Sequence, residues 1–183
     1  MALRHYVSAV AKRQRWHSND LSEAENLFMA TIDFYFDFSS PYGYFASTRI
    51  EEIGSRHGQE IRWWPYLMGA VMKVSNRRPP ITYPLIGDYL RHDVIRSAAL
   101  LHLPFHVPSV FPVTSVAACR AYYWIADTDP TLAKDLARAL YHGYFVADQD
   151  ISEVSTVVQI AREQGVDIES LNTSITSSKV KQR

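Results

Sequence analysis

The chain has 183 residues, of which 47% are hydrophobic, 13% aromatic and 21% charged. Its 19 basic and 19 acidic residues balance, which disfavours a nucleic-acid binder, and no apolar run is long enough to cross a membrane. A single cysteine, Cys119, excludes an internal disulfide and a Cys-X-X-Cys redox pair, and it fits a reducing, cytoplasmic compartment.

Residues 1–28 differ from the rest of the chain. Residues 1–16 carry basic side chains and no acidic ones, and an acidic stretch follows at residues 20–25. This pattern is compatible with a presequence. Met29, however, stands directly before a clean strand and is a natural start. We therefore interpret residues 1–28 as an extension without a structural role.

The stretch from Thr31 to Tyr44 predicts a strand that runs directly into a helix. Hydrophobic and more polar side chains alternate along residues 32–38, and many of them are aromatic, as in a half-buried strand. Ser40 then stands at the N-cap position and Pro41 at the first helical position. The free N–H groups of such a helix start favour an anion, including a thiolate, and a serine hydroxyl there can donate one more hydrogen bond.

The helix that begins at Pro41 is predicted to close near His57, with Gly58 as its left-handed cap. A second strand, Glu60–Pro65, follows it. A crossover of this length makes the two strands parallel neighbours with a right-handed connection.

The remainder of the chain predicts helices joined by proline-rich loops at 75–84 and 105–113. The expected helices span Leu67–Lys73, Leu85–Leu103, Thr114–Ala126, Pro130–Tyr144 and Ser152–Gln164. Thr114 is predicted to be the N-cap of the third of them. Leu85, Tyr89, Leu90, Ile95, Ala98 and Leu101 share one broad apolar face. Cys119 lies in a helical pattern and is interpreted as a small buried apolar residue. Two strands make too small a sheet for a finished core, so we interpret the chain as a truncated polypeptide.

Four motifs stand in a recognisable order between Thr31 and Arg183. They are Asp33–Tyr42 with Tyr44, Gly69–Lys73, Asp88–Arg96 with Ala98, and Leu103-Pro104 with Phe111-Pro112. In order and spacing they resemble the glutathione-dependent 2-hydroxychromene-2-carboxylate isomerases. These enzymes are relatives of the kappa-class glutathione transferases within the DsbA-like branch of the thioredoxin superfamily.

The resemblance implies an α/β, thioredoxin-like fold with an all-helical insertion. Residues 29–66 would form its N-terminal β-α-β part and residues 67–183 the helical insertion, while the closing ββα part would be absent from this chain. The proline that precedes the last strands in such folds would be absent too, because the last proline here is Pro130. A homodimer is a family-level expectation.

The resemblance also implies an enzyme of aromatic hydrocarbon catabolism, such as naphthalene degradation, with glutathione as cofactor. Such an enzyme converts 2-hydroxychromene-2-carboxylate to trans-o-hydroxybenzylidenepyruvate. Ser40 would stabilise the glutathione thiolate, with Pro41 and Tyr42 beside it at the cofactor, and Ser39 could share the hydroxyl role. Ser40–Gly43 replaces the Cys-X-X-Cys pair of redox relatives, which excludes thiol–disulfide exchange. The helix dipole and the hydroxyl together would lower the thiol pKa by about one to three units.

Three residues are implicated in binding an aromatic carboxylate substrate: Lys73, Arg78 and Phe111. Lys73 matches a family lysine near the substrate, and Phe111 an aromatic residue that lines the site; a solvated lysine and ordinary packing are the competing interpretations. Arg78 lies where relatives often carry asparagine, which would suit a different anionic aromatic acid. The charged stripe of Arg91, Asp93 and Arg96 is predicted to form structural salt bridges. No metal-ligand spacing is present among the histidines.

Two alternatives stay open. The chain could be a kappa-class-like glutathione transferase or peroxidase, or it could be an inactive scaffold fragment that binds glutathione weakly or not at all.

Overall fold

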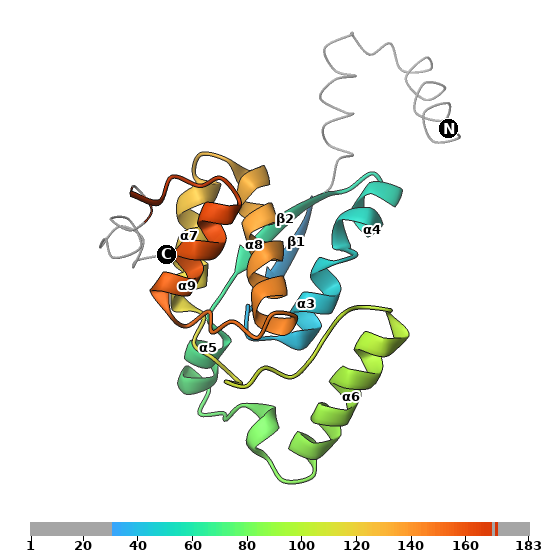
Figure 1. Ribbon diagram of the computed structural model, residues 1–183. Helices are drawn as coiled ribbons and strands as arrows, with labels where there is room; N and C mark the ends of the chain where they lie inside the picture. Colours follow the sequence, from blue (N-terminus) through green and yellow to red (C-terminus); the bar gives the residue numbers. More distant parts are fainter. Residues whose placement is uncertain (1–30, 170, 172–183) are drawn as a thin grey trace, which may run out of the picture.

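The computed structural model describes residues 31–169 and 171 (Figure 1). The predicted extension at 1–28, the start at Met29 and the polar tail beyond residue 171 lie outside the described residues. The described elements are β1 (Thr31–Phe36), α3 (Pro41–Ser47), α4 (Ile50–Arg56), β2 (Glu60–Pro65), α5 (Met68–Val74), the 3₁₀ helix η1 (Pro80–Thr82), α6 (Ile86–Leu100), α7 (Val116–Ala126), α8 (Pro130–Phe145) and α9 (Val154–Glu163). No helix in this part of the chain is long and apolar enough to span a bilayer.

The two strands pair in parallel, from Thr31 opposite Glu60 to Phe36 opposite Pro65, which confirms the predicted neighbours. β2 alternates between exposed and buried residues, and it buries Ile61 and Trp63. β1 becomes buried toward its end, where the Phe36 ring packs edge-on against Trp63 with centroids 5.4 Å apart. The end of β1, from which the chain turns into α3, is thereby anchored in the core.

The single helix predicted from Pro41 to His57 is wrong, because α3 ends at Ser47 and α4 begins at Ile50. The hydroxyls of Ser47 and Thr48 donate to the carbonyl oxygens of Tyr44 and Phe45, at 2.7 and 2.8 Å. Such side-chain hydrogen bonds compete with the helix ladder. Gly58 does adopt the predicted left-handed conformation, with φ of 64°.

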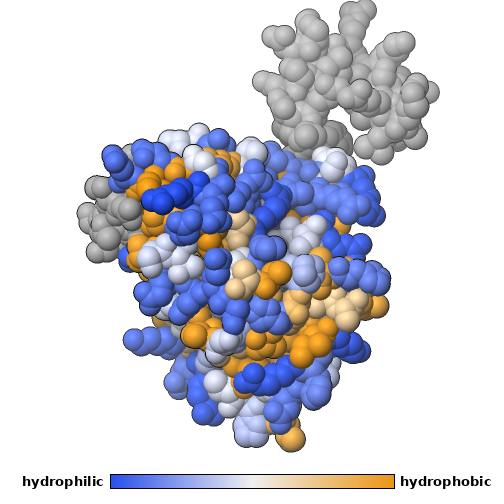
Figure 2. All heavy atoms as spheres, in the orientation of Figure 1, coloured by the Kyte–Doolittle hydropathy of each residue, from blue (hydrophilic) through white to orange (hydrophobic). Residues whose placement is uncertain are grey.

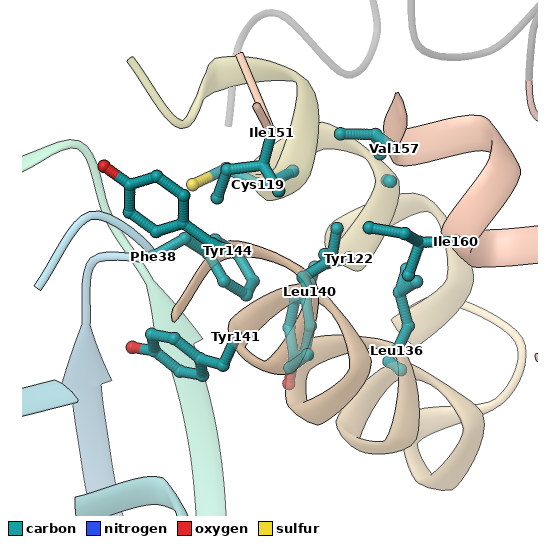
Figure 3. Close-up of a cluster of buried hydrophobic side chains, with 14 of the residues drawn as sticks. Phe38, Cys119, Tyr122, Leu136, Leu140, Tyr141, Tyr144, Ile151, Val157 and Ile160 are labelled. Carbon is teal, nitrogen blue, oxygen red and sulfur yellow. The ribbon is translucent and has the colours of Figure 1, made fainter. Parts of the chain in front are cut away.

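The core lies between the sheet and the helices α7, α8 and α9 (Figure 1). Leu136, Leu140 and Tyr141 of α8 are fully buried; Leu136 lies on the side of α8 that faces Ile160 of α9, and Tyr141 on the side that faces Phe36 and Phe38 (Figure 3). The predicted start of α8 is confirmed: Asp129 caps it by accepting from two backbone N–H groups, and Pro130 is its first residue. Cys119 is buried as predicted, and burial raises the pKa of its thiol to about 12.

Helix α6 is shorter than predicted, and half of the residues of its expected apolar face are exposed. Leu85, Tyr89 and Ile95 are 83%, 61% and 56% exposed, whereas Val94 and Ala98 are buried. The position of α6 explains this exposure, because the helix lies at the margin of the molecule and contacts mainly η1 and α3 (Figure 1). Only a narrow stripe of its side chains is therefore buried.

Gly87 fixes the contact between α6 and η1. A Cβ atom at this position would lie 2.3 Å from the backbone oxygen of Ile81. We expect Gly87→Ala to lower the free energy of unfolding by about 1–3 kcal/mol, because backbone must move to relieve the overlap. Urea unfolding followed by tryptophan fluorescence measures the change.

The matched control is Gly69→Ala in α5, where an added Cβ would meet nothing within 4 Å. That variant should be neutral or more stable by up to about 1 kcal/mol, since alanine is the better helix former. Equal stability of the two variants would contradict the importance of the Gly87 contact.

Candidate functional site

The start of α3 opens into a cavity of about 170 Å³. Its walls come from the first residues of α3, the start of α5, the η1 region, α6 and the connector between α6 and α7. Figure 2 shows hydrophobic residues gathered in the lower half of the visible face, where Figure 1 places α6 and the connector. The wall side chains are mostly apolar, among them Met68, Ile81, Leu90, Val94, Phe105 and Val107.

Ser40 is the N-cap of α3, and Pro41 begins the helix, as predicted. Ser40 Oγ accepts a hydrogen bond of 3.2 Å from the backbone N–H of Gly43. Within the described part of the chain, the Ser40 hydroxyl donates its own proton to no protein acceptor. The half-buried hydroxyl therefore keeps a donor available at the cavity.

Ser39 is not an equivalent donor, although it also lines the cavity. Its hydroxyl donates to Asp37 Oδ1 at 2.8 Å, and its backbone N–H donates to the same oxygen at 2.8 Å. A hydroxyl carries one proton, so that of Ser39 is already used. The geometry thus distinguishes the two serines, which the sequence could not do.

Asp37 positions this turn, and sequence reasoning missed it. Its carboxylate is 3% exposed and also accepts from Ser115 Oγ at 2.9 Å and from the backbone N–H of Met68 at 2.6 Å. One side chain therefore joins the end of β1 to the starts of α5 and α7. A carboxylate between two large aromatic residues at a strand end was the available signal.

Ser115, not Thr114, occupies the N-cap position of α7, and this corrects the prediction. The Ser115 side chain makes no cap hydrogen bond; its hydroxyl donates to Asp37 Oδ1, and its oxygen accepts from Cys119 Sγ at 3.9 Å. A long-range contact has replaced the local one.

The backbone oxygen of Asp37 holds the same turn from the other side. It accepts from the Ser40 N–H at 2.9 Å and from the Tyr141 hydroxyl at 3.1 Å. A Cβ atom on Gly43 would lie 2.5 Å from that hydroxyl, so glycine permits the close approach of α3 and α8. Burial raises the pKa of Tyr141, which keeps the phenol protonated as a donor.

Tyr42 links α3 to α6. Its hydroxyl donates to Asp93 Oδ2 at 2.6 Å, and Asp93 also pairs with Arg96. Partial burial and the hydrogen bond to Asp93 raise the pKa of Tyr42 to about 12, and the Tyr42 hydrogen bond lowers the pKa of Asp93. The predicted structural salt bridge is confirmed for Asp93 and Arg96.

The structure brings together four of the six predicted site residues: Ser40, Pro41, Tyr42 and Phe111 line one cavity. Lys73 is exposed in the last turn of α5, and Arg78 lies over the Tyr83 ring with 4.9 Å between its guanidinium carbon and the ring centroid. Neither belongs to the cavity wall. Among residues 31–169 and 171 no cluster of potential metal ligands occurs.

Comparisons with known proteins identify relatives. The family model of the DSBA-like thioredoxin domain matches residues 31–183. Glutathione S-transferase kappa 1 of Caenorhabditis elegans is 29% identical over 141 residues, which cover 74% of this chain and 62% of that protein. The 2-hydroxychromene-2-carboxylate isomerase of Pseudomonas sp. (strain C18) is 35% identical over 83 residues, which cover 44% of this chain and 37% of that protein. The chain thus spans less than two thirds of the length of these relatives.

A solved structure of a 2-hydroxychromene-2-carboxylate isomerase superposes with a TM-score of 0.72 at 22% identity. The superposition covers 84% of this chain and 74% of that one. At this identity the likeness shows the fold alone.

Proposed function

The chain belongs to the DSBA-like thioredoxin domain family, and from this premise we propose that it is a glutathione-dependent isomerase that converts 2-hydroxychromene-2-carboxylate to trans-o-hydroxybenzylidenepyruvate. The domain match confirms the predicted DsbA-like branch of the thioredoxin superfamily, and the likeness to the solved isomerase confirms the predicted fold. Relatives of this chain are enzymes, named as isomerases and kappa-class transferases. The observation that carries the proposal is the unused Ser40 donor at an apolar cavity.

The donors at the start of α3 fit a thiolate. Pro41 has no N–H. The backbone N–H of Gly43 donates to Ser40 Oγ, and the backbone N–H of Tyr44 donates to the backbone carbonyl oxygen of Ser40. The Ser40 hydroxyl and the Tyr42 N–H remain as donors at this helix end. Because α3 has only seven residues, its dipole contributes less than a long helix would, and the hydroxyl carries most of the stabilisation.

We assign the roles as follows. Glutathione, when bound, supplies the sulfur nucleophile that adds reversibly to a conjugated carbon of the substrate. Ser40 would donate a hydrogen bond to that sulfur and favour its ionised form. Pro41, Tyr42 and Phe111 would exclude water around it, since they form apolar wall at the same place. Asp37 would act only through the turn that it holds.

The test is turnover of the chromene carboxylate by the full chain, with and without glutathione, followed by the change in absorbance. We expect isomerisation that requires glutathione and no net consumption of it. Turnover independent of glutathione would overturn the proposal.

A second candidate function is a kappa-class-like glutathione transferase or peroxidase. The kappa-class relative matches over 74% of this chain, whereas the Pseudomonas isomerase matches over 44%. Net conjugation of glutathione to an aryl halide, without isomerisation of the chromene, would favour this candidate. Calorimetric titration with glutathione separates both from an inactive scaffold, which would bind it weakly or not at all.

A further inference from the structure

We propose that Arg91 binds the carboxylate of a flat aromatic acid in the cavity beside Ser40 and so determines which substrates the site accepts. The inference deepens the proposed function and rests on it for the reaction, but not for the binding. It changes the interpretation of Arg91 from a structural residue of α6 to a substrate-binding one.

Among the residues that the structure describes, Arg91 is the only charged one in the cavity wall, which otherwise consists of apolar, proline, serine and tyrosine side chains. Within the described residues it has no ion-pair partner, although two other charged residues of α6 are engaged: Asp93 pairs with Arg96 and accepts from Tyr42. Arg91 is exposed, and an arginine without an ion-pair partner at the edge of an apolar cavity can bind the anionic group of a molecule that fills the cavity.

Two cations near the same region serve less well. The Arg78 guanidinium is stacked on the Tyr83 ring, and Lys73 projects from an exposed position on α5. Neither contributes to the cavity wall. The anion that a cavity-bound molecule carries would therefore meet Arg91 before either of them.

The remaining walls indicate the rest of the ligand. Phe105 and Phe111 offer aromatic surface, and Met68, Ile81 and Val94 offer aliphatic surface. Such a lining favours a flat hydrophobic body with one acidic group. Arg91 itself is exposed at the rim of the cavity, so its preference for a carboxylate comes from the charge and the paired donors of the guanidinium.

The experiment measures binding to the full chain by calorimetry, without glutathione, using 1-naphthoate and its neutral isostere 1-naphthamide as probes. We expect the acid to bind about tenfold tighter than the amide, since hydrogen bonds to charged groups contribute that much. Arg91→Gln should bring the ratio of the two affinities to about one, and Arg91→Lys should retain part of it. Lys73→Gln and Arg78→Gln serve as matched controls and should leave the ratio unchanged.

An unchanged ratio in Arg91→Gln, or equal affinities of acid and amide for the unmodified chain, would overturn the inference. An equal loss of the acid-to-amide affinity ratio in Lys73→Gln or Arg78→Gln would also overturn it. The preference for the acid would then come from the summed positive charge of this region and not from Arg91. The proposed function is tested separately. If the affinity ratio depends on Arg91 but the chain shows no glutathione-dependent turnover, this inference holds and the proposed isomerase reaction is contradicted.

Discussion

Replacing Ser40 by alanine should lower kcat/KM of the glutathione-dependent reaction about 10- to 100-fold, because a hydrogen bond to a charged sulfur contributes roughly 1.5–3 kcal/mol. The same loss should raise the pKa of the bound thiol by about one to two units, since the donor favours the ionised form. The alkaline rise in the pH–rate profile should therefore move to higher pH. Thiolate absorbance and the profile together measure this shift.

Alanine also removes the cap that accepts from the Gly43 N–H, which costs about 1 kcal/mol of stability. Ser40→Gly is the matched control, because glycine at an N-cap loses only a few tenths of a kcal/mol and equally lacks the hydroxyl. Ser40→Thr keeps both the cap and the donor, and it should retain most of the activity. Full turnover in the alanine and glycine variants would discard the role of Ser40.

The second large effect is expected at Asp37. Asp37→Asn should lower the free energy of unfolding by about 2–4 kcal/mol, because the carboxylate accepts at both oxygens and an amide must turn one N–H₂ group toward a donor. Urea unfolding followed by tryptophan fluorescence measures the loss. Activity should fall as well, because the turn that carries Ser40 depends on the same hydrogen bonds.

Asp33→Asn is the control for this prediction. Asp33 also accepts hydrogen bonds, from Arg62 and Trp64, but it lies on the exposed face of β1. Its replacement should change stability by about 1 kcal/mol or less. Comparable losses at the two aspartates would contradict the view that burial makes Asp37 special.

Local signals predicted the start of the site. Ser40 and Pro41 specify a helix start within a few residues, and Asp129 with Pro130 does the same for α8; both caps are confirmed. The parallel pairing of the strands also followed from local spacing. Such features depend on neighbours in the chain and so leave a readable pattern.

Features that depend on distant partners were not predictable in this way. The donor for Asp37 is Ser115, 78 residues away, and no spacing rule connects them. The pattern of α6 predicted one broad apolar face, but it could not tell which part of that face is covered, and the position of the helix leaves Tyr89 and Ile95 exposed. Arg91 belongs to the cavity only because the connector after α6 returns past it, and helix periodicity carries no such information.

The carboxylate of Asp37 has a consequence for the order of events during synthesis. The strand, the turn and α3 leave the ribosome early, but Ser115 and Tyr141, which fix that turn, are translated much later. Domains generally fold as units, and contacts of long sequence separation form slowly. The serine that we place at the sulfur thus reaches its final orientation only after the second half of the nascent chain has docked.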